Sequence, residues 1–76
     1  MEEVKTCVLR RKSREEIKSF ADRTADKLSE MRQSNAEIMY TGFVTDRNTR
    51  ENVAIILYRC DKEFEEDKPF PGNAYL

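Results

Sequence analysis

The sequence predicts a small α+β domain of β-α-β-β order, with a three-stranded, mostly antiparallel sheet, one amphipathic helix on one face and an irregular C-terminal tail. Three observations support this fold class. Residues 4–9 (VKTCVL) are rich in β-branched and apolar types, as in a strand. Residues 17–31 repeat apolar side chains at helical spacing. Residues 37–45 and 53–60 are apolar and aromatic runs separated by turn-forming residues, as in a β-hairpin.

The helix has a start signal, an apolar stripe and a stop signal. Ser13 followed by Glu16 is a capping-box pattern, which predicts a helix beginning at about Arg14. Ser34 and Asn35 are residues at which a helix can end. The stripe contains six side chains, Ile17, Phe20, Ala21, Thr24, Leu28 and Met31. Charged residues occupy the other side, so the helix can cover one face of a sheet.

The strand order follows from the most apolar strand. Residues 53–60 are apolar at successive positions, which favours the central place in the sheet. Strand, helix, strand and strand run alternately up and down, so residues 53–60 run opposite to both other strands. With residues 53–60 in the centre, every pairing is therefore antiparallel. An order with residues 37–45 in the centre would require one parallel pair and stays open.

Both faces of the predicted hairpin are apolar. We expect Ile38, Tyr40 and Val44 on one face of their strand and Met39, Thr41 and Phe43 on the other. A single helix covers one face only, so we expect a homodimer or higher oligomer, built face to face or through a sheet edge. The alternative is a monomer whose tail folds over the second face.

The end of the chain differs from the rest in composition. We divide the protein into a β-α-β-β domain at residues 1–60 and an acidic, proline-containing tail at residues 61–76. The tail is expected to be irregular and to dock through Phe64, Phe70 and Tyr75. Its acids at 65–67 are more typical of a solvated charge run than of a cation site.

Composition argues against several functions. The chain has no histidine and no glycine-rich phosphate-binding motif, so we expect no enzyme activity, no metal and no cofactor. Cys7 and Cys60 are expected to be reduced core residues, although a bridge between neighbouring strands stays open. Lys and Arg number 14 against 15 Asp and Glu, so no overall positive field attracts nucleic acid. With neither a secretion signal nor an apolar run of about 18 residues, we expect a cytoplasmic protein with no membrane segment.

Basic residues gather at two places and suggest an anion site. Arg10, Arg11, Lys12 and Arg14 lie at the junction of the first strand and the helix, and helix N-termini attract anions. The hairpin loop adds Arg47 and Arg50, whose guanidinium groups suit phosphate. Tyr40 and Tyr58 are the residues that we expect to stack on a ring, with core packing as the alternative. The alternative for the basic cluster is a solvated turn that balances nearby acids.

The hairpin also carries a family resemblance. The segments EIMYTGFVTD and VAIILYRC, after a capped helix, resemble small β-α-β-β proteins of spore-forming bacteria and their phages, including a sporulation-associated family of unsettled function. The resemblance covers about residues 4–60 and consists of an I-x-Y strand paired with an apolar strand ending in Tyr. It does not extend to the basic cluster or the tail, so it assigns no functional residue. It implies a setting in which small phage proteins block host factors by binding, including oligomers that sequester nucleotide signals of antiviral defence.

Two functional hypotheses follow. The first is a non-catalytic oligomer that holds a small anionic, nucleotide-like ligand between its subunits through the basic residues and tyrosines. The second is an inhibitor or adaptor that binds a host protein through the open sheet face, a sheet edge or the acidic tail.

Overall fold

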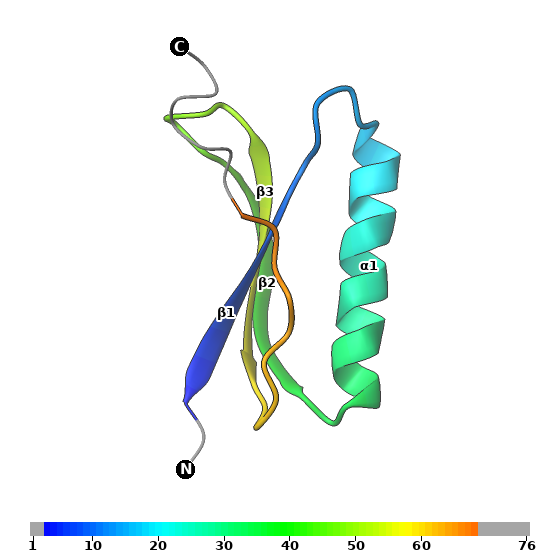
Figure 1. The fold of residues 1–76 in the computed structure, drawn as a ribbon, viewed down its shortest axis with the longest axis vertical. Coiled ribbons are helices and arrows are strands. Elements are labelled where there is room, and N and C mark those ends of the chain that lie inside the picture. The colour runs from blue at the N-terminus through cyan, green and yellow to red at the C-terminus, as the bar shows by residue number, and fades with distance from the viewer. Residues whose placement is uncertain (1–2, 69–76) are drawn as a thin grey trace.

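The computed structural model describes residues 3–68, and these form one open sheet with one helix on one side (Figure 1). The elements are β1 (Val4–Arg10), α1 (Ile17–Gln33), β2 (Glu37–Thr45) and β3 (Asn52–Arg59). The sheet order is β1-β3-β2, and both pairings are antiparallel. The predicted β-α-β-β fold, with the most apolar strand in the centre, is therefore confirmed.

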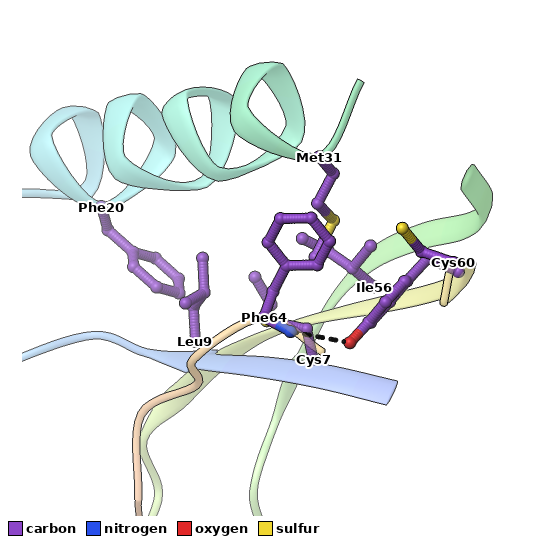
Figure 2. Close-up of a cluster of buried hydrophobic side chains, with 9 residues drawn as sticks. Cys7, Leu9, Phe20, Met31, Ile56, Cys60 and Phe64 are labelled. Atoms are coloured by element: carbon purple, nitrogen blue, oxygen red, sulfur yellow. Dashed lines mark hydrogen bonds between the residues drawn. The ribbon is translucent and has the colours of Figure 1, made fainter. Parts of the chain in front are cut away.

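The core lies between α1 and the face of the sheet that α1 covers. Ala54, Ile56 and Tyr58 of β3 point into it and are almost completely buried, as are Cys7 and Leu9 of β1. The helix contributes Phe20, Thr24 and Met31. Figure 2 shows Phe20 and Met31 reaching down from the helix toward these strand residues. The predicted stripe is narrower than expected, because Ile17 and Ala21 at the start of the helix are exposed.

A bulge in β2 changes which of its side chains face the helix. The register against β3 shifts between Ile38 and Tyr40. Ile38 lies opposite Tyr58 and packs against the core, while Tyr40 lies opposite Leu57 on the other face. The extra residue of a bulge breaks the strict alternation of a strand. The expectation that Ile38 and Tyr40 share a face was therefore wrong.

The predicted capping box does not form. Helix α1 begins at Ile17, and its N-cap is Glu16, whose side chain makes no capping hydrogen bond. The preceding residues form a tight turn instead, in which the N–H of Glu15 donates to the carbonyl of Lys12 at 3.0 Å. Arg14 has a φ of 66° in this turn, so the chain cannot be helical there.

The predicted helix stop at Ser34 and Asn35 is confirmed. Asn35 has a φ of 63°, and its N–H donates to the carbonyl of Arg32. The N–H of Ala36 donates to the carbonyl of Met31, and the two side chains belong to the same apolar cluster. These are the bonds and the contact of a Schellman motif with Asn at its left-handed position.

The first part of the tail runs along the outer edge of β1. The N–H of Asp67 donates to the carbonyl of Val8, while the N–H of Val8 donates to the Glu66 carboxylate. Phe64 enters the core, and its N–H donates to the Tyr58 hydroxyl at 3.1 Å (Figure 2). The expected docking through Phe64 is therefore observed, whereas Phe70 and Tyr75 lie outside the described residues.

Candidate functional site

The two basic segments of the sequence lie at one end of the molecule (Figure 1). The N–H of Arg11, just after β1, donates to the carbonyl of Asn52 at the start of β3. Arg10 also approaches two acids of the hairpin loop, Asp46 at 3.6 Å and Glu51 at 3.4 Å. The antiparallel pairing of β1 with β3 produces this arrangement. We call this region the basic end, formed by Arg10, Arg11, Lys12, Arg14, Arg47, Arg50 and Lys68.

Two of the predicted anion-binding residues are partly engaged within the protein. The Arg10 guanidinium is mostly buried between the acids of the hairpin loop. Arg11 donates from Nε to the carbonyl of Glu15 at 2.7 Å. These contacts fix the two side chains in place and reduce the charge that they offer to a ligand.

The other four predicted cations are exposed. Lys12, Arg14, Arg47 and Arg50 make no side-chain hydrogen bond or ion pair with any residue of the described range 3–68. Arg14 and Arg50 also have positive φ angles of 66° and 59°. A left-handed conformation costs an ordinary residue roughly 1 to 2 kcal/mol, and such strain is often found at functional sites. These four residues are therefore the part of the basic end most available to an anion.

The basic end includes a shallow hollow that the sequence did not predict. Arg10, Arg11, Lys12, Asp67 and Lys68 surround a volume of about 200 Å³. Lys68 belongs to the segment that we expected to be an acidic tail. Its position follows from the pairing of Asp67 with Val8, which carries the tail along β1 to this end of the molecule.

Arg23, on the helix, joins the basic end to the tail. Its guanidinium donates two hydrogen bonds to the Glu15 carboxylate, at 2.8 and 2.9 Å, and a third to Asp67 at 3.2 Å. A fourth reaches the backbone carbonyl of Arg10 at 2.7 Å. The hydrogen bonds from Arg23 lower the pKa of Glu15 to about 2. The sequence pattern places Arg23 only on the polar side of the helix, because nothing in a single sequence pairs position 23 with position 67.

The two predicted stacking residues have different environments. Tyr58 is buried in the core and its hydroxyl is occupied by Phe64, so its ring offers no surface to a ligand. Tyr40 is 52% exposed on the open face of the sheet, where its ring lies across Gly42. Tyr40 is five residues from Thr45, about 17 Å along a strand, so one copy of the chain does not bring it to the hairpin loop.

The sheet face away from α1 is largely apolar, and residues 3–68 leave most of it uncovered. The register places Val8, Ile55 and Leu57 on this face, where they are half-buried, and Val4, Tyr40 and Val44 there as exposed residues. Residues 61–68 run beside β1 and insert Phe64 on the helix side, so they do not cover this face. We call this surface the open face.

The acids of the tail and the two cysteines have structural contacts. Carboxylates of Glu66 and Asp67 accept hydrogen bonds from the N–H groups of Val8 and Arg10. Within residues 3–68, no group of three or more histidine, cysteine or acidic side chains is placed to hold a metal ion. Cys7 and Cys60 are free and buried, and burial raises the pKa of the Cys7 thiol. Cys7 lies opposite Ile56 rather than Cys60, which rules out a bridge in this register.

Comparison of the chain with protein-family models, with curated proteins and with solved structures finds no match in any of the three. In the described part of the chain, the single helix α1 is neither long nor apolar enough to cross a membrane.

Proposed function

We propose that this protein is a non-catalytic binding protein that self-associates and sequesters a small anionic, nucleotide-like ligand at its basic end, next to the interface between copies. The observation that carries the proposal is the open face. An exposed, largely apolar sheet surface is typical of a site at which another molecule binds. Burial of one large apolar side chain contributes roughly 1.5 to 3 kcal/mol, so covering several of them would stabilise a domain of this size considerably.

The exposed cations support an anionic ligand. Lys12, Arg14, Arg47 and Arg50 lie on two loops at one end of the molecule, without partners among residues 3–68. Clusters of such side chains bind phosphate by charge-assisted hydrogen bonds. The positive φ angles of Arg14 and Arg50 cost stability, and a role in anion binding would explain why arginine occupies these two positions.

The resemblance of the hairpin to small phage proteins supplies the setting that we propose. The protein would act in the cytoplasm as an inhibitor of antiviral defence, by withdrawing a nucleotide signal. Reduced Cys7 and Cys60 agree with a cytoplasmic setting.

The test combines solution mass with ligand binding. Light scattering over a range of protein concentrations should detect an oligomer. Calorimetry with a panel of cyclic dinucleotides and oligonucleotides should then detect binding that weakens as salt is added. A particle that stays monomeric at high concentration would contradict the self-association, and a panel without a binder would contradict the ligand.

Two loop variants test the basic end without disturbing the fold. Arg14→Gly and Arg50→Gly remove exposed cations and relieve positive φ angles, so each should stabilise the protein by about 0.5 to 1 kcal/mol while weakening anion binding. Asn35→Gly is the matched control, since it changes a positive-φ position outside the basic end. Unchanged binding by both arginine variants would exclude the loops as the anion site.

A second candidate function is inhibition of a partner protein through the open face. The observation that favours it is the same apolar surface, with Tyr40 and Val44 exposed on it. Because Glu66 and Asp67 are bonded to the backbone of β1, the acidic tail is a weaker candidate surface. Capture of one defined host protein that is lost in Tyr40→Lys, by a chain that binds no nucleotide, would favour this function over the first.

A further inference from the structure

We propose that two copies of the chain pair antiparallel through the outer edge of β2, about a twofold axis near Gly42, and so form one continuous six-stranded sheet. The inference rests on the self-association in the proposed function and specifies the surface that mediates it. It selects a sheet edge rather than the open face as the principal contact.

The two edges of the sheet differ in their hydrogen bonding. On the β1 edge, the N–H groups of Val8 and Arg10 donate to the carboxylates of Glu66 and Asp67, and the carbonyl of Val8 accepts from Asp67. The tail thereby blocks that edge against another strand. The outer edge of β2 has no such cover from residues 3–68. An uncovered edge presents unpaired backbone groups that can pair with another strand.

The sequence of β2 lacks the usual protection of an edge strand. Its nine residues, EIMYTGFVT, contain no lysine, arginine or proline. Glu37 at its start and the bulge between Ile38 and Tyr40 protect only its beginning, and Tyr40–Thr45 stays regular and uncharged. A pairing centred on Gly42 uses this regular stretch, with Tyr40 opposite Val44 and Thr41 opposite Phe43 of the second copy.

Exposed apolar side chains flank this edge on both sides of the sheet. On the helix side, Phe43 is 57% exposed and Ile17 is 61% exposed, and they border a groove of about 390 Å³ between β2 and the start of α1. On the open face, Tyr40 and Val44 are 52% and 46% exposed. A strand added at the edge would cover side chains on both sides at once, whereas stacking of two open faces would leave Phe43 and Ile17 exposed.

The two ends of β2 are complementary in charge. Glu37 is the first residue of β2, and Arg47 lies two residues after Thr45, the last residue of β2. Antiparallel pairing about Gly42 brings the start of β2 in each copy, with Glu37, toward the hairpin loop of the other, with Arg47, so the symmetric interface contains this opposite-charge pair twice. Within one copy the two residues are separated by about 30 Å of strand and cannot meet.

The same pairing brings a ring toward the anion site, where Lys12, Arg14 and Arg50 stay available to the ligand while Arg47 pairs with Glu37 of the other copy. Tyr40 of one copy would lie opposite Val44 of the other, only three residues from Arg47. The ring that one copy holds far from its own hairpin loop is thereby brought toward the loop of the second copy. Tyr40 and Phe43 together would bury about 200 Å² per copy, part of the roughly 800 Å² that a stable interface buries on each partner.

The first experiment compares two lysine substitutions by analytical ultracentrifugation. Phe43→Lys places a charge beside the β2 edge on the helix side, and we expect it to weaken dimerisation about 100-fold, since desolvating an unpaired charge costs several kcal/mol. Val4→Lys places the same charge on the open face, at the far side of the sheet, and should leave the dimer intact. Circular dichroism checks that both variants fold.

The second experiment reverses the charge pair and does not depend on the Phe43 variant folding. Glu37→Arg should weaken the dimer about tenfold through two disrupted surface pairs, and adding Arg47→Glu should restore it. The ion pair of Glu37 with Arg59 inside one copy cannot produce this rescue, because Arg47→Glu does not restore it. Dissociation by Val4→Lys but not by Phe43→Lys, or the absence of rescue, would overturn the edge pairing while leaving the proposed oligomer in place. A monomeric wild-type chain would overturn both.

Discussion

At the scale of single residues, Arg23 organises the largest polar network in the described structure. One guanidinium joins Glu15 in the loop before the helix, Asp67 in the tail and the carbonyl of Arg10 at the end of β1. The end of β1, the loop that follows it and the distant tail thus depend on one planar side chain, which supplies five fixed donors. The sequence pattern placed Arg23 correctly on the polar side of the helix, but its partners are set by tertiary structure.

Replacement of Arg23 tests this network. Arg23→Met keeps the length of the side chain and should destabilise the fold by about 3 kcal/mol at neutral pH, because it removes the charge-assisted hydrogen bonds to two carboxylates and the hydrogen bond to a carbonyl. Arg32→Met is the control, since Arg32 is exposed on the same helix. Urea unfolding of both variants measures the difference. A loss no larger than that of the control would show that water replaces the guanidinium without cost.

The same network should give acid sensitivity. The pKa of Glu15 is lowered from 4.5 to about 2 in the folded protein, chiefly by the hydrogen bonds from Arg23. A carboxyl whose pKa is lower in the folded state stabilises the fold above its unfolded pKa and loses that effect as it is protonated. The contribution is therefore complete above pH 4.5 and declines as the pH falls toward 2. The difference in stability between wild type and Arg23→Met should shrink over this interval, and a constant difference would contradict the assignment.

Tyr58 shows how one polar atom can fix the tail. Tyr58→Phe removes the acceptor for the N–H of Phe64 while keeping the ring, so we expect a loss of about 1 to 2 kcal/mol. The amide of Phe64 should exchange with solvent faster in the variant. Tyr40→Phe is the matched control and should be nearly neutral, because no hydrogen bond to the Tyr40 hydroxyl is observed among residues 3–68.

At the scale of elements, the helix illustrates what local sequence can and cannot predict. The stop at Asn35 was predictable because Asn adopts the left-handed conformation more readily than most residues. The start was predicted three residues too early. Ser13 and Glu16 match a capping box, but the Glu15 carboxylate accepts from the N–H of Lys12 and from Arg23, and the turn that results delays the helix to Ile17.

The observed N-cap can be improved. Glu16 occupies that position with an extended backbone and makes no side-chain capping bond. Glu16→Ser should therefore stabilise the protein by about 0.5 to 1 kcal/mol, as measured by thermal unfolding. Ser13→Ala should have almost no effect. A large loss in Ser13→Ala would restore the capping box that the sequence suggested.

The tail acts as an element of the fold although it contains no helix or strand in its described part. Phe64 is 6% exposed and its ring packs edge-on against Tyr58, with centroids 5.5 Å apart. Phe64→Ala should cost about 3 to 5 kcal/mol in urea unfolding, since it opens a cavity in a small core. Phe43→Ala should cost much less, because that ring is already more than half exposed. Equal losses would show that the tail is not part of the core.

At the scale of the whole molecule, the strand order was predictable and the path of the tail was not. An apolar run such as Val53–Leu57 needs cover on both faces and both edges, and this requirement alone places β3 in the centre. The route of residues 61–68 depends on the fit of Phe64 against Tyr58 and of Asp67 against Arg23. Lys68 consequently joined the basic end without any local signal.

Self-association should make the stability depend on protein concentration. If the folded chain pairs and the unfolded chain does not, mass action raises the unfolding temperature as the concentration rises. Differential scanning calorimetry over a hundredfold range of concentration should detect this shift in the wild type. Phe43→Lys should show a smaller dependence of the unfolding temperature on concentration, and a wild type whose unfolding temperature is independent of concentration would contradict the pairing.

The pairing of β1 with β3 also sets an order of events during synthesis. Val4 lies opposite Arg59, so one of the first residues described finds its neighbour only after more than fifty others have been joined to the chain. The helix can form as it leaves the ribosome, whereas β1 must wait for β3 and then for the segment that carries Phe64. During this interval β1 has no hydrogen-bonded neighbour on either edge. A chain stalled at that stage would be a ready substrate for chaperones.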